Sequence, residues 1–257
     1  MTECVRVERA DSVVRLVLAR PERLNAVSEE LYRRLLEELS RADAGSDVRV
    51  IVLAGEGRAF CVGADLKAHA EGRTSAQQAE YVELGWRVCE AIQRSSKPVI
   101  AAVHGYALGA GAEMATSADF LVMAEDAQMG FPEISIGTYV GGGVTRRLPR
   151  LVGLRRATEL LMLGERFTGT DAVAWGLAHL AVPADKLDAA VSDLAQRLAA
   201  KAPLSLARLK AALQSEAPFD EVLRTEAADL LAIMRTADWA EGVRAFRDRR
   251  TPSFKGE

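Results

Sequence analysis

Four apolar runs recur along the first three-quarters of the chain, and each is rich in β-branched residues or alanine. They are SVVRLVLAR (Ser12 to Arg20), VRVIVLAG (Val48 to Gly55), KPVIAAVHG (Lys97 to Gly105) and DFLVMAE (Asp119 to Glu125). Runs of this length predict strands when turn residues bound them, and helical patterns lie between them. Because helical crossovers join strands that run in the same direction, the alternation predicts an α/β fold with parallel strands.

Helices are predicted between these strands and throughout the last quarter of the chain. The helical stretches are Ser28 to about Ala42, Ser75 to Arg94, Gly111 to Thr116, and an Ala- and Leu-rich region from Lys186 to Arg249 with breaks near Pro203 and Pro218. The segment from Ala211 to Met234 is so apolar that another surface must cover it. Packing on its own domain and contact with another copy of the chain both satisfy this requirement.

The composition argues against several classes of partner. The chain has 257 residues, 33 Lys and Arg against 36 Asp and Glu, and a net charge of −3, without a basic stripe interleaved with aromatic residues. Nucleic acid is therefore not an expected partner. No apolar run approaches the roughly 20 residues that span a bilayer, and the start MTECVRVERADSV lacks an apolar signal region. We expect a cytoplasmic protein without a membrane partner.

The cysteines and histidines form no recognisable ligand pattern. The three cysteines are an odd number without CxxC spacing, so we expect free thiols in a reducing compartment. The three histidines lie far apart, so no metal site is expected. We interpret Cys61 as a packing residue and His104 as a structural one. The full set is Cys4, Cys61, Cys89, His69, His104 and His179.

Two glycine-rich stretches follow predicted strands and suit the close approach of a ligand. They are GRAFCVGADLK (Gly57 to Lys67) and GYALGAGAE (Gly105 to Glu113). Small residues let a ligand reach the backbone, and the N–H groups at a helix start point outwards unpaired. The helix dipole behind them favours negative charge. Such N–H groups can bind a phosphate or a developing oxyanion.

Two glutamates stand in otherwise apolar segments. Glu113 ends GYALGAGAE, and Glu133 follows a proline in GFPEISIGTYVGGGVTRRLPR, twenty residues further on. The strand DFLVMAE and its turns can bridge that separation. Two carboxylates that converge in an apolar cleft can act as a general acid and a general base without a metal. The alternative is that each glutamate merely caps a helix N-terminus or interacts with its dipole.

These motifs together resemble the enoyl-CoA hydratase/isomerase (crotonase) superfamily. AFCVGADLK, KPVIAAVHGYALGAGAEMA and FPEISIGTYVGGGVTRRLPRLVG occur in the family's order and at its separations. The resemblance extends from RPERLNAV near residue 20 through FTGTDAVAWGLAHLAVP to AFRDRRTPSF. It implies a ClpP-like spiral of repeated ββα units as the catalytic core over residues 1–195. A C-terminal helical trimerisation region would follow over residues 196–257, and trimers of the family usually pair into hexamers.

The resemblance implies enoyl-CoA hydratase chemistry, the syn addition of water to a 2-enoyl-CoA thioester or its reverse. The thioester oxygen would lie between the N–H groups of Ala64 and Ala110. Glu113 would activate the water that attacks Cβ, and Glu133 would deliver a proton to Cα. Gly141 would help to position substrate or water. Enoyl-CoA isomerisation and a pathway-specific hydratase or dehydratase are the alternatives within the family.

The implied substrate is an acyl-CoA, and no cofactor beyond its own coenzyme A is implied. The resemblance assigns coenzyme A contacts to Arg23, Leu24, Ala64, Asp65, Leu66, Lys67, Phe246 and Arg249. The chain departs from the common family pattern at Ala110, Val140, Val144, Arg146 and Arg249. Arg249 stands where a lysine is expected, and it can still pair with a phosphate. Residues 140–146 border the implied acyl pocket, so an unusual acyl group is expected.

Two other classes of function agree less well with the residues. A dinucleotide-binding dehydrogenase would need a GxGxxG turn early in the chain, but GAGAEM lacks the third small residue and lies more than 100 residues in. A catalytically silent scaffold or RNA-binding member disagrees with the near-neutral charge and with the intact glutamate pair.

Overall fold

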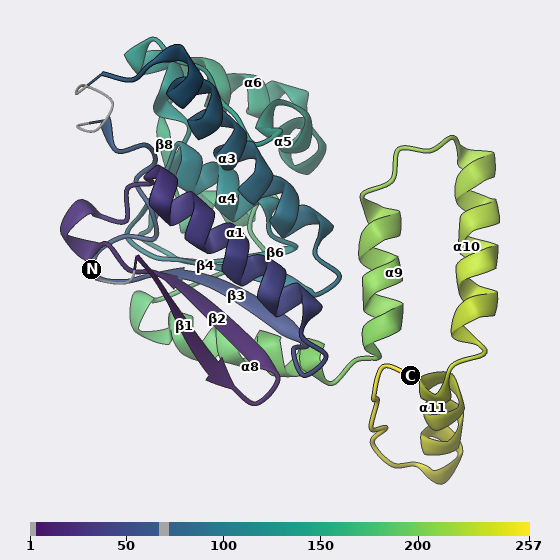
Figure 1. Cartoon of the computed structure of the whole chain (residues 1–257). Helices are drawn as coiled ribbons and strands as arrows, with labels where there is room; N and C mark the ends of the chain where they lie inside the picture. The colour runs from purple at the N-terminus through teal and green to yellow at the C-terminus, as the bar shows by residue number, and fades with distance from the viewer. Residues whose placement is uncertain (1–3, 67–71) are drawn as a thin grey trace.

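The computed structural model describes residues 4–66 and 72–257, and Figure 1 shows the whole chain. In these residues a six-stranded sheet has the order β1-β2-β3-β4-β6-β9. β1 and β2 form an antiparallel hairpin, and the other neighbours are parallel. The strands are β1 (Val5–Ala10), β2 (Val13–Leu18), β3 (Val50–Gly55), β4 (Val99–Val103), β6 (Phe120–Ala124) and β9 (Leu180–Val182). The four strands predicted from the sequence are therefore present, with shorter bounds.

A second, smaller sheet supplies the second strand of the repeated ββα units. Its strands are β5 (Tyr106–Leu108), β7 (Gln128–Gly130) and β8 (Arg166–Thr168), in the order β5-β7-β8. The chain passes from β4 to β5 and then into α4 (Ala110–Ser117), and from β6 to β7 and then into the short helix η2 (Pro132–Ile136). After β3, a bridge between Cys61 and Ala107 supplies the equivalent contact to the small sheet. The expected succession of ββα units is confirmed.

Helices cover both faces of the large sheet, as Figure 1 shows. α1 (Glu29–Ala44), α3 (Ser75–Arg94) and α4 lie on one face, and α8 (Leu187–Ala199) lies on the other. Along β3, Ile51 and Leu53 join the core under α1 and α3, while Val50 and Val52 pack against α8. Strands buried on both faces read as continuous apolar runs, which is why the sequence revealed them.

The remaining elements connect and extend these layers. They are η1 (Pro21–Arg23), α5 (Val144–Val152), α6 (Leu154–Leu163), α7 (Gly169–Ala174), η3 (Ala184–Lys186), α9 (Pro203–Leu213), α10 (Phe219–Ile233) and α11 (Ala237–Asp248). No helix among the described residues is long and apolar enough to cross a membrane.

Side-chain caps define where the two long helices start. The Ser28 hydroxyl accepts a hydrogen bond from the Leu31 N–H at the start of α1. Thr74 and Gln77 form a capping box at the start of α3, whose bounds coincide with the predicted Ser75 to Arg94. Each cap satisfies N–H groups that a helix start leaves unpaired.

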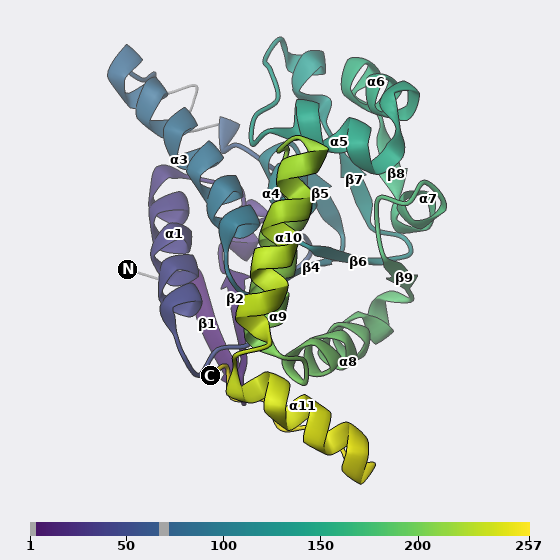
Figure 2. The ribbon, with the colours of Figure 1, turned by 90° about the vertical axis from the view of Figure 1, so that its right-hand side faces the viewer.

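The last three helices leave the sheet and form an arm beside the body (Figures 1 and 2). α9 begins at Pro203 and Pro218 precedes α10, so both predicted breaks are confirmed. α10 has no buried residue within the chain. The domain boundary proposed at residue 195 falls inside α8, where Ala195 packs against the sheet. The division into a core and an oligomerisation region stays a prediction.

Candidate active site

The start of α4 lies tightly against its surroundings. Gly109 precedes the helix with φ 53° and ψ −124°, a conformation that disfavours side chains. A Cβ at Gly111 would lie 2.1 Å from the Cys61 carbonyl oxygen, and one at Gly109 would lie 3.1 Å from Glu133 Oε1. Gly109 and Gly111 therefore let the first turn of α4 reach the segment of Cys61 and the carboxylate of Glu133.

Beside this turn lie two backbone N–H groups that donate to no acceptor among the described residues. Gly63, with φ 90°, lies where an added Cβ would be 3.4 Å from the Ala110 nitrogen. The Val27 N–H donates to the Gly63 carbonyl and the Asp65 N–H donates to the Val27 carbonyl, so the Ala64 N–H between them points the other way. Within the described residues, neither Ala64 nor Ala110 donates its N–H to a protein acceptor. The structure brings these two predicted oxyanion donors together.

Glu113 lies one turn beyond Ala110 on the same helix and is 8% exposed. Its Oε1 accepts a hydrogen bond of 2.5 Å from the Gly141 N–H. Burial raises the pKa of Glu113, and the Gly141 N–H and the charge of Arg147 lower it in part. In this structure the Gly141 N–H contacts the Glu113 carboxylate, and its role in positioning substrate or water stays a prediction.

Glu133 lies in the first turn of η2 and is 9% exposed. Burial raises its pKa to about 7, with a further contribution from the nearby charge of Glu113 and an opposing one from its own backbone N–H. Its Oε2 is buried and has no hydrogen-bond partner in the part of the chain that the structure describes. Both glutamates do lie near helix starts, and the charge of Glu113 also acts on Glu133, an effect that a capping role alone does not explain.

The predicted coenzyme A residues near the N-terminus lie beside this site. The Leu24 carbonyl accepts from the Val62 N–H, and Asp65 pairs with Arg20 at 3.2 Å. Arg23 ends η1 on the same loop. Leu66 is 55% exposed, and Lys67 lies outside the described residues.

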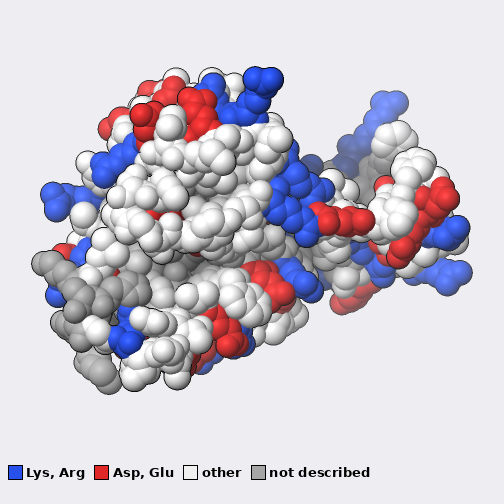
Figure 3. Space-filling view, turned by 90° about the horizontal axis from the view of Figure 1, so that it is seen from above, with Lys and Arg blue, Asp and Glu red and all other residues white. Residues whose placement is uncertain are grey.

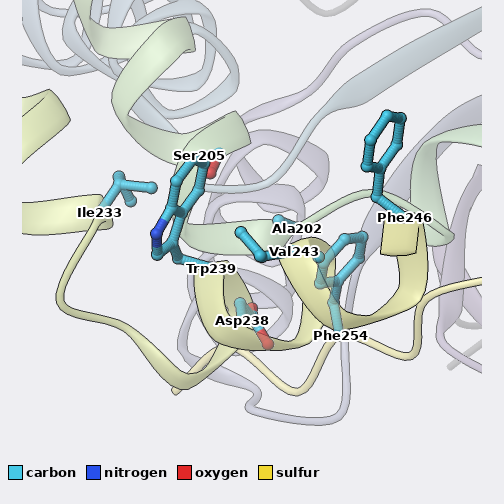
Figure 4. A pocket seen from close by; sticks show the side chains of 9 residues that line it. Ala202, Ser205, Ile233, Asp238, Trp239, Val243, Phe246 and Phe254 are labelled. Atoms are coloured by element: carbon cyan, nitrogen blue, oxygen red, sulfur yellow. The ribbon is translucent and has the colours of Figure 1, made fainter. Parts of the chain in front are cut away.

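The two predicted coenzyme A residues of the tail lie elsewhere in the chain. Phe246 is 88% exposed on α11, and Arg249 caps its end. Both ribbon views place α11 well away from α4 (Figures 1 and 2). Phe246 instead borders an apolar pocket of about 430 Å³, and Figure 4 shows Trp239 and Ile233 at one end of it and Phe246 and Phe254 at the other. Within one chain, the structure does not join Phe246 and Arg249 to the glutamates.

The residues expected to border the acyl pocket have different environments. Val144 is buried, and Val140 packs against the core. Arg146 is exposed and pairs with Glu216, in the link between α9 and α10. Exposed apolar side chains nearest Glu133 in sequence are Ile134, Ile136 and Tyr139. Figure 3 shows a largely uncharged face with charged residues gathered along its edges.

The surroundings of Cys61 and His104 fit the packing and structural roles predicted for them, and His69 lies outside the described residues. Cys61 is fully buried, and burial raises the pKa of its thiol to about 12. The His104 ring lies 2.9 Å from the Gly57 carbonyl oxygen. Among the described residues, no group of three or more His, Cys, Asp or Glu side chains could hold a metal ion.

Two residues at the site escape the sequence patterns. Asn25 is fully buried; its amide donates to the Glu56 and Ala59 carbonyls, which fixes the loop that carries Leu24. Arg147 lies behind Glu113 and donates to the Glu113 carbonyl at 3.2 Å. One signal was available for Arg147, because it follows Val144 by three residues and so shares the buried face of α5.

A protein-family model described as enoyl-CoA hydratase/isomerase matches residues 8–257. The chain belongs to the enoyl-CoA hydratase/isomerase family. Among its relatives, the 2,3-dehydroadipyl-CoA hydratase of Escherichia coli (strain K12) is 37% identical over 258 residues and is covered completely, as is this chain. The carnitinyl-CoA dehydratase of Salmonella typhi is 34% identical over 263 residues, again with complete coverage of both chains.

Solved structures of the family share the fold. The crystal structure of an enoyl-CoA hydratase from Bacillus anthracis matches with a TM-score of 0.95 and 33% identity, and the match covers 99% of this chain and 100% of that one. The expected crotonase fold is therefore confirmed. The relatives named here are hydratases and a dehydratase, and this member of the enoyl-CoA hydratase/isomerase family is an enzyme of the hydro-lyase kind.

Proposed function

We propose that the chain is an enoyl-CoA hydratase, which adds water syn across the 2,3 double bond of an enoyl-CoA thioester or removes it in reverse. The observation that carries this proposal is the meeting of two buried carboxylates beside two open N–H groups. The Glu133 carboxylate lies against Gly109, and Glu113 lies one turn beyond Ala110. Isomerisation needs a single proton-transferring group, so the intact pair favours hydration.

The environments of the two carboxylates support different roles. A Glu133 pKa near 7 keeps a proton available at neutral pH, as a general acid needs. Glu113 keeps its charge more easily, because the Gly141 N–H and Arg147 stabilise the carboxylate. We therefore assign Glu113 as the base that orients and deprotonates the water, and Glu133 as the acid that protonates Cα.

The proposed step balances in protons and bonds. Water loses a proton to Glu113 as its oxygen forms the bond to Cβ, and the double-bond electrons move towards the thioester. The Ala64 and Ala110 N–H groups stabilise the negative charge that develops on the thioester oxygen. Cα then takes the proton of Glu133. The site returns to its starting state when a proton passes from Glu113 to Glu133, directly or through solvent.

The assignment of coenzyme A contacts leads to a proposal about assembly. Arg23, Leu24 and Asp65 lie on segments joined to Ala64 by backbone hydrogen bonds, so one chain can supply this part of the contact. Phe246 and Arg249 lie on the arm. We propose that they approach the coenzyme A of a neighbouring copy in a homotrimer or in a hexamer of two trimers. The lack of any buried residue in α10 within one chain supports such an assembly.

A hydration assay tests the function directly. We expect loss of enone absorbance when the purified protein is mixed with crotonyl-CoA, longer 2-enoyl-CoAs or 2,3-dehydroadipyl-CoA. The last substrate is included because a relative with 37% identity bears its name. Absence of turnover on every substrate, with binding of the acyl-CoA demonstrated separately, would contradict the proposal.

A further inference from the structure

Arg147 connects three structural elements behind the candidate base. It lies on α5, and its guanidinium donates to the Gly142 carbonyl at 3.0 Å, the Glu113 carbonyl at 3.2 Å and the Thr116 hydroxyl at 3.3 Å. Glu113 and Thr116 belong to α4. The planar guanidinium therefore joins the glycine loop before α5 to the helix that carries Glu113.

The loop joined in this way supplies the partner of the Glu113 carboxylate. Gly141, which precedes Gly142, donates the 2.5 Å hydrogen bond to Glu113 Oε1. The loop also packs closely on α3, because a Cβ at Gly142 would lie 2.6 Å from Cys89 Sγ. Arg147 contacts no carboxylate oxygen of Glu113. It can therefore influence the position of this carboxylate through the loop, and its pKa through the charge of the guanidinium.

We propose that Arg147 is a positioning residue for Glu113: its guanidinium holds the 141–143 loop on α4, so that the Gly141 N–H stays directed at the carboxylate. This role rests on the proposed function, in which Glu113 is the catalytic base that Arg147 aligns. The buried Nε of Arg147 has no hydrogen-bond partner among the described residues, so its burial carries a desolvation cost.

The charge of Arg147 makes this role measurable through the pKa of Glu113. Its charge lowers the pKa of Glu113, against the raising effect of burial. In the part of the chain that the structure describes, the other titratable groups that interact electrostatically with Glu113 are Glu133, Cys61, Cys89 and Tyr32. Burial raises the pKa of the two thiols and of the tyrosine, so these three stay neutral near pH 7. Removal of the Arg147 charge must therefore raise the pKa of Glu113 and move the acid limb of the rate profile to higher pH.

Three variants on α5 separate the charge from the geometry. Arg147→Met removes both, and we expect kcat to fall about 10- to 100-fold, since a misplacement of about 1 Å can cost on the order of 10²-fold. KM should change little, because the coenzyme A contacts are elsewhere. Arg147→Lys keeps the charge and should retain the wild-type acid limb with a partial loss of kcat. Arg150→Met, one turn away on the exposed side, is the matched control and should behave as wild type.

A second readout does not depend on turnover. In protein labelled with ¹³C at the glutamate carboxyl, Glu113→Gln identifies the Glu113 resonance, and its titration gives the pKa directly. We expect a higher value in Arg147→Met than in the Arg150→Met control. An unchanged Glu113 pKa, or a kcat equal to that of the control, would overturn the proposal.

The kinetic and NMR measurements also decide two further cases, a variant that does not fold and a wild type that hydrates no enoyl-CoA. If Arg147→Met does not fold, Arg147→Lys still tests the geometry, and a wild-type kcat in that variant overturns the role of the planar donor set. If the wild type hydrates no enoyl-CoA while the Glu113 resonance shifts as expected, the proposed function fails and the positioning role stands.

Discussion

At the scale of single residues, Glu113 and Glu133 show how the same side chain acquires two characters. Burial raises the pKa of both, and the difference comes from what surrounds each carboxylate. Glu113 receives the Gly141 N–H, whereas one oxygen of Glu133 lies buried without a hydrogen-bond partner among the described residues. A proton is therefore held more readily on Glu133 than on Glu113.

The carboxyl groups themselves should be essential for turnover. We predict that Glu113→Gln and Glu133→Gln each lower kcat by about 10²-fold or more, the scale of a lost general acid or base. Steady-state hydration assays measure the effect. Glu125→Gln, at an exposed glutamate after β6, is the matched control. Near-wild-type turnover in either active-site variant would refute the role assigned to that residue.

Glu133→Gln should also change how stability depends on pH. The folded-state pKa of Glu133 is about 7, above the ordinary value of 4.5, so folding is favoured by this group at low pH and loses that contribution as pH rises towards 7. The amide avoids the loss. We predict that urea denaturation finds the variant more stable than wild type at about pH 8, by on the order of 2 kcal/mol after allowance for solvent screening, and nearly equal at about pH 5. Equal stability at both pH values would contradict this.

Sequence patterns revealed the glutamates but not Arg147, for a physical reason. A carboxylate inside GYALGAGAE stands out, because an apolar segment offers it no solvation. Arg147 lies in the charged segment TRRLPR beside the exposed Arg146, where a solvated face is the ordinary interpretation. Its spacing of three residues from the buried Val144 was the one signal available, and the packing of α5 against α4 shows that Arg147 points inwards.

At the scale of elements, the periodicity of apolar residues predicted the strands and helices that are long enough to display a repeating pattern. The buried strands and the amphipathic helices α1 and α3 were predicted close to their observed bounds. β1 was not predicted, because its charged residues lie exposed at the sheet edge. The strands of the small sheet have three residues each, too few for an alternation to register. Only the family resemblance implied the second strand of each repeat.

The first turn of α4 offers a test at this scale. Gly111→Ala would place a Cβ 2.1 Å from the Cys61 carbonyl oxygen, so the helix start must shift. We predict a loss of about 1 to 3 kcal/mol in the free energy of unfolding, as for other overpacked sites, together with a loss of turnover. Gly242→Ala, in α11 with its nearest atom at 3.7 Å, should be neutral or slightly stabilising. Urea denaturation of both variants decides the matter, and equal stabilities would exclude the proposed contact.

At the scale of the whole molecule, the arm carries apolar surface that the chain itself does not cover. α10 has no buried residue, and Leu223, Leu230 and Leu231 are each about half exposed. Apolar surface of this extent is the usual mark of an interface. The proposed assembly would cover this surface, whereas the sequence alone was equally compatible with packing on its own domain.

We predict that the wild-type chain forms trimers or hexamers and that Leu230→Glu with Leu231→Glu yields monomers. Charges at these positions would have to be desolvated in an interface. Light scattering coupled to size exclusion gives the mass of each form. Arg197→Glu, an exposed charge on α8, is the control and should keep the wild-type mass. A monomeric wild-type protein would contradict the proposed assembly.

A buried ammonium group is one of the contacts that join the arm to the body. Lys210 Nζ on α9 lies 2.7 Å from an Asp119 oxygen and 3.0 Å from each of the Ile92 and Lys97 carbonyl oxygens. Asp119 follows α4 and Ile92 belongs to α3, so these three contacts meet where the two helices end. A ring of identical copies closes only if every arm leaves its body in the same direction. Lys210 thus helps to fix the direction of α9, and in the proposed ring the angle between neighbouring copies would depend in part on this buried contact.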